Sequence, residues 1–188
     1  MKRARLLRLA FAVAAIGALT LVVAGGPATA TTKSKAGATV ITMEREGKDL
    51  FFDGPATVAS GTPLKVTNNT NPRAVGPHTF SLVKERTLPE TRDQIHKCQK
   101  EFKGMCGQVI RWHEVDLETG EVGENPVEVG KDGWDRLGDR KRKGDSWVTE
   151  KRKGQSFKRE VTAPAGKTLF FFCAVHARMQ GEITVTEG

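Results

Sequence analysis

The sequence has no apolar run long enough to form an ordinary membrane-spanning helix. Its longest predominantly apolar run is Leu9–Ala24, which is shorter than the roughly 20 residues that a bilayer requires. A basic head, Met1–Arg8, precedes this segment, and the small-residue pattern Ala28–Ala30 follows it after the helix-breaking Gly25–Pro27. This order predicts a secretory signal peptide over residues 1–30, with an uncleaved membrane anchor as the alternative. No cysteine follows the apolar segment, which argues against a lipid anchor.

The sequence also lacks a strong excess of charge of one sign once the predicted signal peptide is set aside. The full sequence carries a net charge of +8, and removal of the four basic residues in the predicted signal peptide leaves about +4. Such a mildly basic protein gives no indication of nucleic-acid binding. Residues 31–188 suffice for one domain with a well-buried core. We expect export to a periplasmic, cell-surface or extracellular location, with membrane contact only through an uncleaved signal anchor.

Short β-rich segments with Gly and Pro turns between them occupy both ends of this domain, which predicts an all-β sandwich or barrel. The stretch 85–150 differs, because it is charged and poor in apolar runs. We expect it to be a long, partly helical insertion, with a helix over Arg92–Phe102 and a strand over Val109–Val115. The other expected strands are Ala38–Met43, Leu50–Phe52, Ala56–Ala59, Leu64–Thr67, His78–Lys84, Ser156–Thr162, Leu169–Ala174 and Glu182–Thr186.

The expected strand near the C-terminus is apolar on both faces. Cys173, Phe171 and Leu169 share one face, whereas Phe170 and Phe172 point to the other side. A strand that is apolar on both faces is covered on both faces. We therefore expect the insertion to pack over Phe170 or Phe172.

Cysteines are scarce, and their odd number leaves one without a cysteine partner. Cys98 and Cys106 lie close together in the insertion, and a disulfide between them suits an oxidising compartment. An alternative is a second metal site that also uses His96 and His113, but this spacing matches no established zinc pattern. We interpret both histidines as ordinary surface or half-buried residues. Cys173 is left over and requires an explanation of its own.

Cys173, His176 and Met179 place a thiolate, an imidazole and a thioether within seven residues. Soft sulfur with imidazole suits copper, and one cysteine and two histidines with a weak axial methionine form the blue-copper arrangement. The second histidine must come from elsewhere. His78 is the candidate, because it begins an expected strand after a loop that Pro77 stiffens. The alternatives are that Cys173 is an inert buried thiol and that Met179 only fills the core.

Two segments of the chain resemble plastocyanin-like and azurin-like cupredoxins. Residues 154–185 resemble the C-terminal half of this family and residues 55–80 the N-terminal half, and the short ligand loop looks most like that of amicyanin. The resemblance implies a Greek-key β-sandwich that binds one copper ion, Cu(I) or Cu(II), through His78, Cys173, His176 and Met179 and transfers one electron. A departure from plastocyanin is Thr79, where that protein often has asparagine. The residues that carry the resemblance are Gly154–Phe157, Ala163–Gly166, Phe171–Cys173, His176, Met179, Gly181, Ile183 and Val185, with Pro55, Gly61, Asn68–Asn69 and His78.

An electron carrier of this family has redox partner proteins, and two segments are candidates for docking them. By resemblance, the outer edge of His176 faces solvent, inside an apolar collar of Ala174, Val175 and Ala177. A run of basic residues over 136–153 is either a docking patch for an acidic partner or anionic surface or a solvated loop. The run has its densest charge at Arg140, Lys141, Arg142 and Lys143.

Several features of other copper proteins are absent. The sequence has no His-x-His pair, which multicopper oxidases and nitrite reductases need, and no second cysteine near Cys173 for a binuclear centre. We therefore expect no enzyme. The expected mature chain has only Met43, Met105 and Met179 as methionines. This scarcity disfavours the alternative of a non-redox copper chaperone, store or scavenger.

Overall fold

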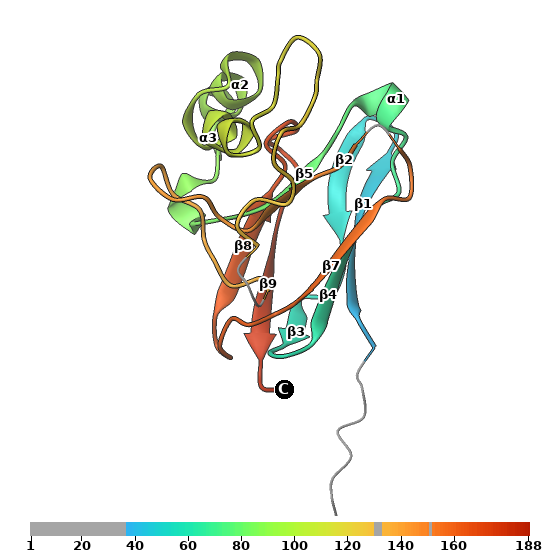
Figure 1. The fold of residues 1–188 in the computed structure, drawn as a ribbon, viewed down its shortest axis with the longest axis vertical. Helices are drawn as coiled ribbons and strands as arrows, with labels where there is room; N and C mark the ends of the chain where they lie inside the picture. Colours follow the sequence, from blue (N-terminus) through green and yellow to red (C-terminus); the bar gives the residue numbers. More distant parts are fainter. Residues whose placement is uncertain (1–36, 130–132, 151) are drawn as a thin grey trace, which may run out of the picture. The chain divides into compact units, whose positions relative to one another are not determined.

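The computed structural model describes residues 37–129, 133–150 and 152–188, and the expected signal peptide lies outside them. Strands of these residues form two sheets (Figure 1), which confirms the all-β sandwich with a partly helical insertion. The strands are β1 (Thr39–Glu46), β2 (Asp49–Asp53), β3 (Thr57–Ala59), β4 (Pro63–Asn68), β5 (Thr79–Val83), β6 (Ser146–Val148), β7 (Ser156–Glu160), β8 (Thr168–Phe172) and β9 (Gln180–Thr186). The helices are α1 (Pro72–Val75), η1 (Glu85–Thr87), α2 (Arg92–Glu101) and α3 (Gly104–Trp112).

The strand order gives the fold its Greek-key character. One sheet has the order β2-β1-β4-β7 and the other β3-β9-β8-β5-β6. β5 therefore lies beside β8, from which it is distant in sequence, and the two strands run antiparallel with Ser81 opposite Phe172. β6 belongs to the stretch expected to be an insertion, yet it pairs with β5 as an edge strand.

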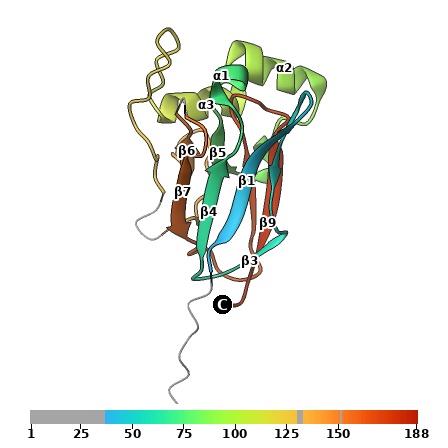
Figure 2. The same ribbon diagram turned by 90° about the vertical axis from the view of Figure 1, so that its right-hand side faces the viewer.

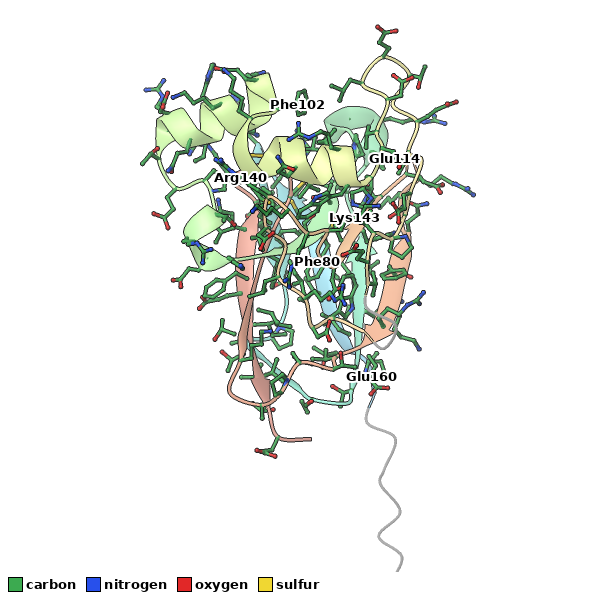
Figure 3. All side chains as sticks on the ribbon, turned by 60° about the vertical axis from the view of Figure 1, so that its left-hand side comes forward. Phe80, Phe102, Glu114, Arg140, Lys143 and Glu160 are labelled. Atoms are coloured by element: carbon green, nitrogen blue, oxygen red, sulfur yellow. A yellow bond between two sulfur atoms is a disulfide. The ribbon has the colours of Figure 1, made fainter. Side chains whose placement is uncertain are left out.

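Alternation along the strands places the main core between the two sheets. Ile41 on β1, Leu64 on β4 and Phe171 on β8 are among its fully or almost fully buried residues. Phe80 packs against Phe171, with ring centroids 4.6 Å apart, and against the edge of Trp134 at 5.2 Å. Figure 3 shows Phe80 in the interior of the domain. Because such packing is dense, this core forms a rigid base for the loops at the ends of the strands.

The insertion contains two helices instead of the helix and strand that the sequence predicts. α2 confirms the expected helix, and its N-terminus has a capping box in which the Thr91 hydroxyl accepts from the amide of Gln94. The expected strand over Val109–Val115 is wrong, because most of these residues belong to α3. The β-branched residues there favour a strand locally, but Met105, Cys106, Val109 and Ile110 are buried at the spacing of a helix.

A second apolar cluster joins these helices to the outer face of the β5/β8 sheet. Phe172 and Val83 are completely buried there, together with Ile95 of α2 and Val109 of α3. This packing confirms that the insertion covers Phe172. Phe170, which shares its face, is only half-buried. The sandwich thus has a third layer over one sheet.

The disulfide expected between Cys98 and Cys106 is present and joins α2 to α3. Replacement of both cysteines by alanine is expected to lower the free energy of unfolding by about 2.5 kcal/mol, because the bond closes a short loop with a sequence separation of 8. Urea denaturation of the variant against the oxidised wild type measures this loss. An unchanged unfolding midpoint would contradict the expectation.

Helices α1, α2 and α3 gather at one end of the strands in both ribbon views (Figures 1 and 2). The same end receives the start of β5 and the connection from β8 to β9, because β5 and β9 are both antiparallel to β8. The fold therefore brings His78 and the loop from Cys173 to Met179 together. Among the described residues, no helix combines the length and the apolar character needed to cross a membrane.

Candidate metal centre

The loop from Cys173 to Met179 is closed by its own main chain. The amide of Cys173 donates to the carbonyl of Met179 at 2.9 Å, and the amide of Met179 donates to the carbonyl of His176 at 2.8 Å. Cys173 and Met179 are both buried in the core between the sheets. The loop is thereby fixed on two strands of the rigid sandwich.

His78, Cys173 and His176 converge at this end of the sandwich, as the sequence predicts. Sγ of Cys173 lies 3.8 Å from Nδ1 of His78 and 3.7 Å from Nδ1 of His176. All three potential donor atoms lie within 4.8 Å of one another. No other group of three or more His, Cys, Asp or Glu side chains in the described part of the chain is placed to hold a metal ion.

A short hydrogen-bond chain orients the imidazole of His78. Nε2 of His78 lies 2.9 Å from Oγ1 of Thr70, which donates to Oδ1 of Asn68 at 2.7 Å. Because the Thr70 hydroxyl has given its one proton to Asn68, it must accept from Nε2–H of His78. Nδ1 then carries the lone pair, and it faces Cys173. Such partners fix the tautomer and direction of metal-binding histidines.

Asn68, Thr70 and Thr149 are functional residues that the sequence reasoning missed. Besides the contacts of Asn68 and Thr70, the hydroxyl of Thr149 accepts from the amide of His78 at 2.8 Å. The polar loop after β4 gave a signal for the first two residues. Thr149 gave none, because it lies 71 residues from His78.

Burial keeps both candidate histidines neutral at pH 7. Desolvation, with a smaller contribution from the nearby His176, lowers the pKa of His78 to about 4. Burial also lowers the pKa of His176, against the opposing effect of a hydrogen bond with the main chain of Val75 in α1. A neutral imidazole has the lone pair that a metal ion needs.

The sulfur of Cys173 receives two main-chain hydrogen bonds. The amides of Thr79 and His176 donate to Sγ at 3.3 and 3.4 Å. Complete burial raises the pKa of this thiol, and these hydrogen bonds oppose the rise. Metal binding releases the thiol proton, and the two amides then stabilise the thiolate.

Thr79 ties the two ligand segments together, although plastocyanin often has asparagine at this position. Its amide reaches Cys173, and its hydroxyl accepts from the amide of Ala174 at 2.8 Å. The same hydroxyl donates to the carbonyl of Phe172 at 3.4 Å. One threonine thus connects the start of β5 to both residues that flank Cys173.

This donor set fits one copper ion. A thiolate and two imidazole nitrogens already face one another in a buried site, and Met179 lies in the same buried region. The set is too soft for calcium or magnesium, which prefer oxygen ligands. One cysteine and two histidines with a nearby methionine match the blue-copper arrangement. Met179 as the axial ligand remains a prediction.

The expected apolar collar is wrong for two of its three residues. Ala174 and Ala177 are fully buried, because they pack in the cluster that contains α2 and α3. Only Val175 is partly exposed, and its carbonyl accepts from the side chain of Gln99 on α2 at 3.4 Å. The insertion therefore occupies one flank of the ligand loop.

His96 and His113 form no second metal site, since the two cysteines that such a site needs are in the disulfide. His96 is exposed, as expected. The expectation for His113 is wrong, because this residue is completely buried at the C-terminus of α3. Two partners compensate its burial: Nδ1 lies 2.8 Å from the carbonyl of Glu124, and Nε2 lies 2.7 Å from the hydroxyl of Ser146.

His113 is expected to make the stability of the metal-free protein depend on pH. Burial lowers its pKa to about 4, with a smaller lowering by Lys143 and opposing effects from Glu124. Below pH 6.5 the ring of His113 is protonated in the unfolded chain, whereas in the folded protein it stays neutral until the pH approaches 4. Stability is therefore complete above pH 6.5 and falls towards pH 4, by up to about 3 kcal/mol for this ring. Urea denaturation between pH 7 and 4 measures the loss, which His113→Gln should reduce; an equal loss in the variant would contradict the assignment to His113.

The basic run over 136–153 is partly built into the fold. Trp134 precedes this run and Trp147 lies within it, and both are buried in the core. Lys143 pairs with Glu124, whereas Arg140, Lys141 and Arg142 are not buried. Figure 3 shows Arg140 and Lys143 on the segment below α3.

The Greek-key sandwich and the cluster of His78, Cys173 and His176 with Met179 nearby have the form of a cupredoxin. Neither a protein-family model nor a curated protein sequence matches the chain. Solved structures are similar. A dithionite-reduced auracyanin from Roseiflexus castenholzii has 21% identity, a TM-score of 0.37, and coverage of 80% of this chain and 99% of that chain.

Two further solved structures are similar over comparable lengths. Auracyanin A of Chloroflexus aurantiacus, described as a "blue" copper protein, has 19% identity and a TM-score of 0.38, with coverage of 80% of this chain and 100% of that chain. A purple cupredoxin from Nitrosopumilus maritimus has 12% identity and a TM-score of 0.38, with coverage of 79% and 99%.

Proposed function

We propose that the protein binds one copper ion through His78, Cys173, His176 and Met179 and carries single electrons between redox partners. The observation that carries this proposal is the direction of the donor atoms: Nδ1 of both histidines faces the sulfur of Cys173 in a buried cluster. A bound copper ion supplies one-electron chemistry by alternating between Cu(II) and Cu(I).

The surroundings of the ligands suit rapid electron transfer. The hydrogen bond from His78 to Thr70 and those from main-chain amides to Cys173 hold the ligands in place. A site that moves little when its charge changes loses little energy in reorganisation. His176 is only half-buried and is the ligand nearest to solvent, which makes its ring the route for the electron.

Copper loading of residues 31–188 tests the proposal directly. The Cu(II) form is expected to show an intense visible band from thiolate-to-copper charge transfer, to bleach on reduction and to recover on oxidation. His78→Ala should disrupt the band, whereas His113→Ala, which alters a buried histidine outside the cluster, should disrupt it less. Copper binding without this band, or a band that does not return, would reject the electron carrier.

The alternative function is non-redox copper binding, as in a chaperone, store or scavenger. Such a protein exchanges its ion, which an exposed and mobile set of ligands favours. Here His78 and Cys173 are fully buried and held by several hydrogen bonds. A copper enzyme is disfavoured because the described residues contain no second cluster of metal-binding side chains beside this one.

Export of the protein is part of the same proposal. The Cys98–Cys106 disulfide supports it, since such bonds persist in oxidising compartments. Expression of the full chain in a bacterium, followed by mass measurement, is expected to give a periplasmic protein that begins at Thr31. Full-length protein retained in the cytoplasm would contradict export.

For the redox partner, we propose a protein with an acidic surface. Arg73 of α1, Arg152 and Lys153 line a depression of about 500 Å³, and α1 also contacts His176 through Val75. Of these cations, Arg152 pairs with the exposed Glu150 at 3.3 Å. Arg140, Lys141 and Arg142 add a second exposed basic segment, which would steer the partner from a distance.

The charge of the partner can be tested with small redox reagents. Oxidation by the anion hexacyanoferrate(III) is expected to slow with rising salt, and Arg73→Glu should slow it severalfold at low salt. Arg140→Glu is the matched control and should have a smaller effect. Rates that are independent of salt and of both variants would contradict an acidic partner.

A further inference from the structure

The outer face of β5 carries polar side chains in a place that water does not reach. Thr79, Ser81 and Val83 alternate along this face, and all three are completely buried. On an uncovered sheet the two hydroxyls would face solvent. Here the insertion lies over them, and buried hydroxyls require hydrogen-bond partners.

These hydroxyls form a continuous chain from the ligand loop to the insertion. The amide of Ala174, next to Cys173, donates to Oγ1 of Thr79 at 2.8 Å. Oγ1 of Thr79 lies 3.0 Å from Oγ of Ser81, which lies 2.7 Å from Oγ of Ser146 on β6. Nε2 of His113 follows at 2.7 Å from Ser146.

The chain ends at an acceptor, the carbonyl of Glu124, which lies 2.8 Å from Nδ1 of His113. The main-chain carbonyl of His113 in turn accepts from the amides of Gly123 and Glu124, each at 3.1 Å. His113 is thus held against this loop from both its side chain and its main chain. The chain has a fixed end within the insertion.

The ring of His113 has one tautomer that satisfies both of its partners. Since a carbonyl only accepts, Nδ1 must carry hydrogen to bond Glu124, and the Nε2 of a neutral ring then accepts from Ser146. Nearer the ligand loop, Ser81 donates to Oγ1 of Thr79, and Thr79 donates to the carbonyl of Phe172 at 3.4 Å.

We propose that His113, Ser146 and Ser81 are positioning residues for Cys173. They form one hydrogen-bond chain that holds Thr79 in place. Thr79 in turn holds the amide of Ala174 and donates its own amide hydrogen to the sulfur of Cys173. The part of this inference that concerns copper rests on the proposed function. The part that concerns the hydrogen-bond chain does not depend on that function. Burial, which lowers the pKa of His113 to about 4, supports the neutral ring with Nδ1–H at pH 7.

The consequence for a bound copper ion follows from the bond between Thr79 and Cys173. A hydrogen bond to the sulfur withdraws charge from the thiolate and favours the reduced, Cu(I) state. Interruption of the chain leaves Thr79 less tightly held. The chain would thus let the insertion influence the redox potential without touching a ligand.

NMR of the copper-free protein tests the chain independently of copper. Nitrogen shifts of His113 at pH 7 are expected to show the Nδ1–H tautomer. The Ala174 amide should exchange its hydrogen at least about tenfold faster in Ser81→Ala, Ser146→Ala and His113→Phe than in the wild type. His113→Gln keeps a polar group at this position and should restore part of the protection. Ser60→Ala, which removes a hydroxyl bonded to the carbonyl of Ala163, is the control and should change nothing at Ala174.

Potentiometry of the copper-loaded variants completes the test. At a fixed applied potential, the ratio of reduced to oxidised protein should fall about threefold in Ser146→Ala, with the charge-transfer band retained, and remain unchanged in Ser60→Ala. An Nε2–H tautomer, or unchanged Ala174 exchange in folded variants, overturns the chain. If the protein does not bind copper but the exchange results are as expected, only the proposed function is refuted and the hydrogen-bond chain stands. If Ser146→Ala does not fold, the comparison of His113→Gln with His113→Phe decides.

Discussion

Replacement of Cys173 by serine is expected to abolish the visible colour of the copper-loaded protein and to weaken Cu(I) binding by at least about 100-fold. The colour depends on charge transfer from a thiolate, and a serine oxygen does not provide it. The reduced ion prefers soft sulfur, so its affinity falls more than that of Cu(II). The geometry makes the effect large, since Sγ of Cys173 is the atom that both histidine nitrogens face.

Absorption spectra and competition with a Cu(I) chelator measure the two effects. The fold of the variant should be retained, because serine is slightly smaller than cysteine and the loop is closed by the main-chain bonds between residues 173 and 179. Ser60→Ala is the control, since it removes a hydroxyl bonded to the carbonyl of Ala163 and leaves the donor set complete. A coloured Cys173→Ser protein would show that another residue supplies the sulfur ligand.

Replacement of Phe172 by alanine is expected to lower the free energy of unfolding by about 3–5 kcal/mol. Phe172 is completely buried between β8 and the helices of the insertion. Truncation leaves a cavity in the second cluster, beside Val83 of β5, Ile95 of α2 and Val109 of α3. The loss is a large fraction of the stability of an ordinary domain.

Phe170→Ala provides the matched control, because Phe170 belongs to the same strand and face but is only half-buried. Urea denaturation should show a markedly smaller loss for this variant. Phe172→Ala should also speed hydrogen exchange of the Ala174 amide, since the carbonyl of Phe172 and the amide of Ala174 both bind Thr79. Equal losses for the two variants would contradict the role of the insertion as a packed layer.

The local order of the chain determined much of the fold and half of the site. Alternating apolar residues determined the strands, because a strand buries every second side chain whatever its partners. The spacing of Cys173, His176 and Met179 determined one ligand loop, since seven consecutive residues cannot spread far apart. Thr91 and Gln94 similarly determined where α2 begins.

Only the tertiary structure decided which surfaces are covered. Val109 and Ile110 have a local preference for a strand, yet both lie in α3, where Val109 packs in one cluster with Ile95 of α2 and Phe172 of β8. The position of Ala174 and Ala177 beside a ligand predicts that they are exposed, yet the insertion buries them. The burial of a residue depends on its contacts with residues that are distant in sequence, so no local sequence pattern predicts it.

The surroundings of the ligands depend on tertiary structure for the same reason. Thr149 lies 71 residues from His78, and Thr79 lies 94 residues from the sulfur to which its amide donates. The sequence by itself determined the chemical identity of the donors, which is a property of single side chains at a short spacing. Their direction, protonation and cover came from the packing of two sheets and a helical layer, because hydrogen bonds and desolvation act across space and not along the chain.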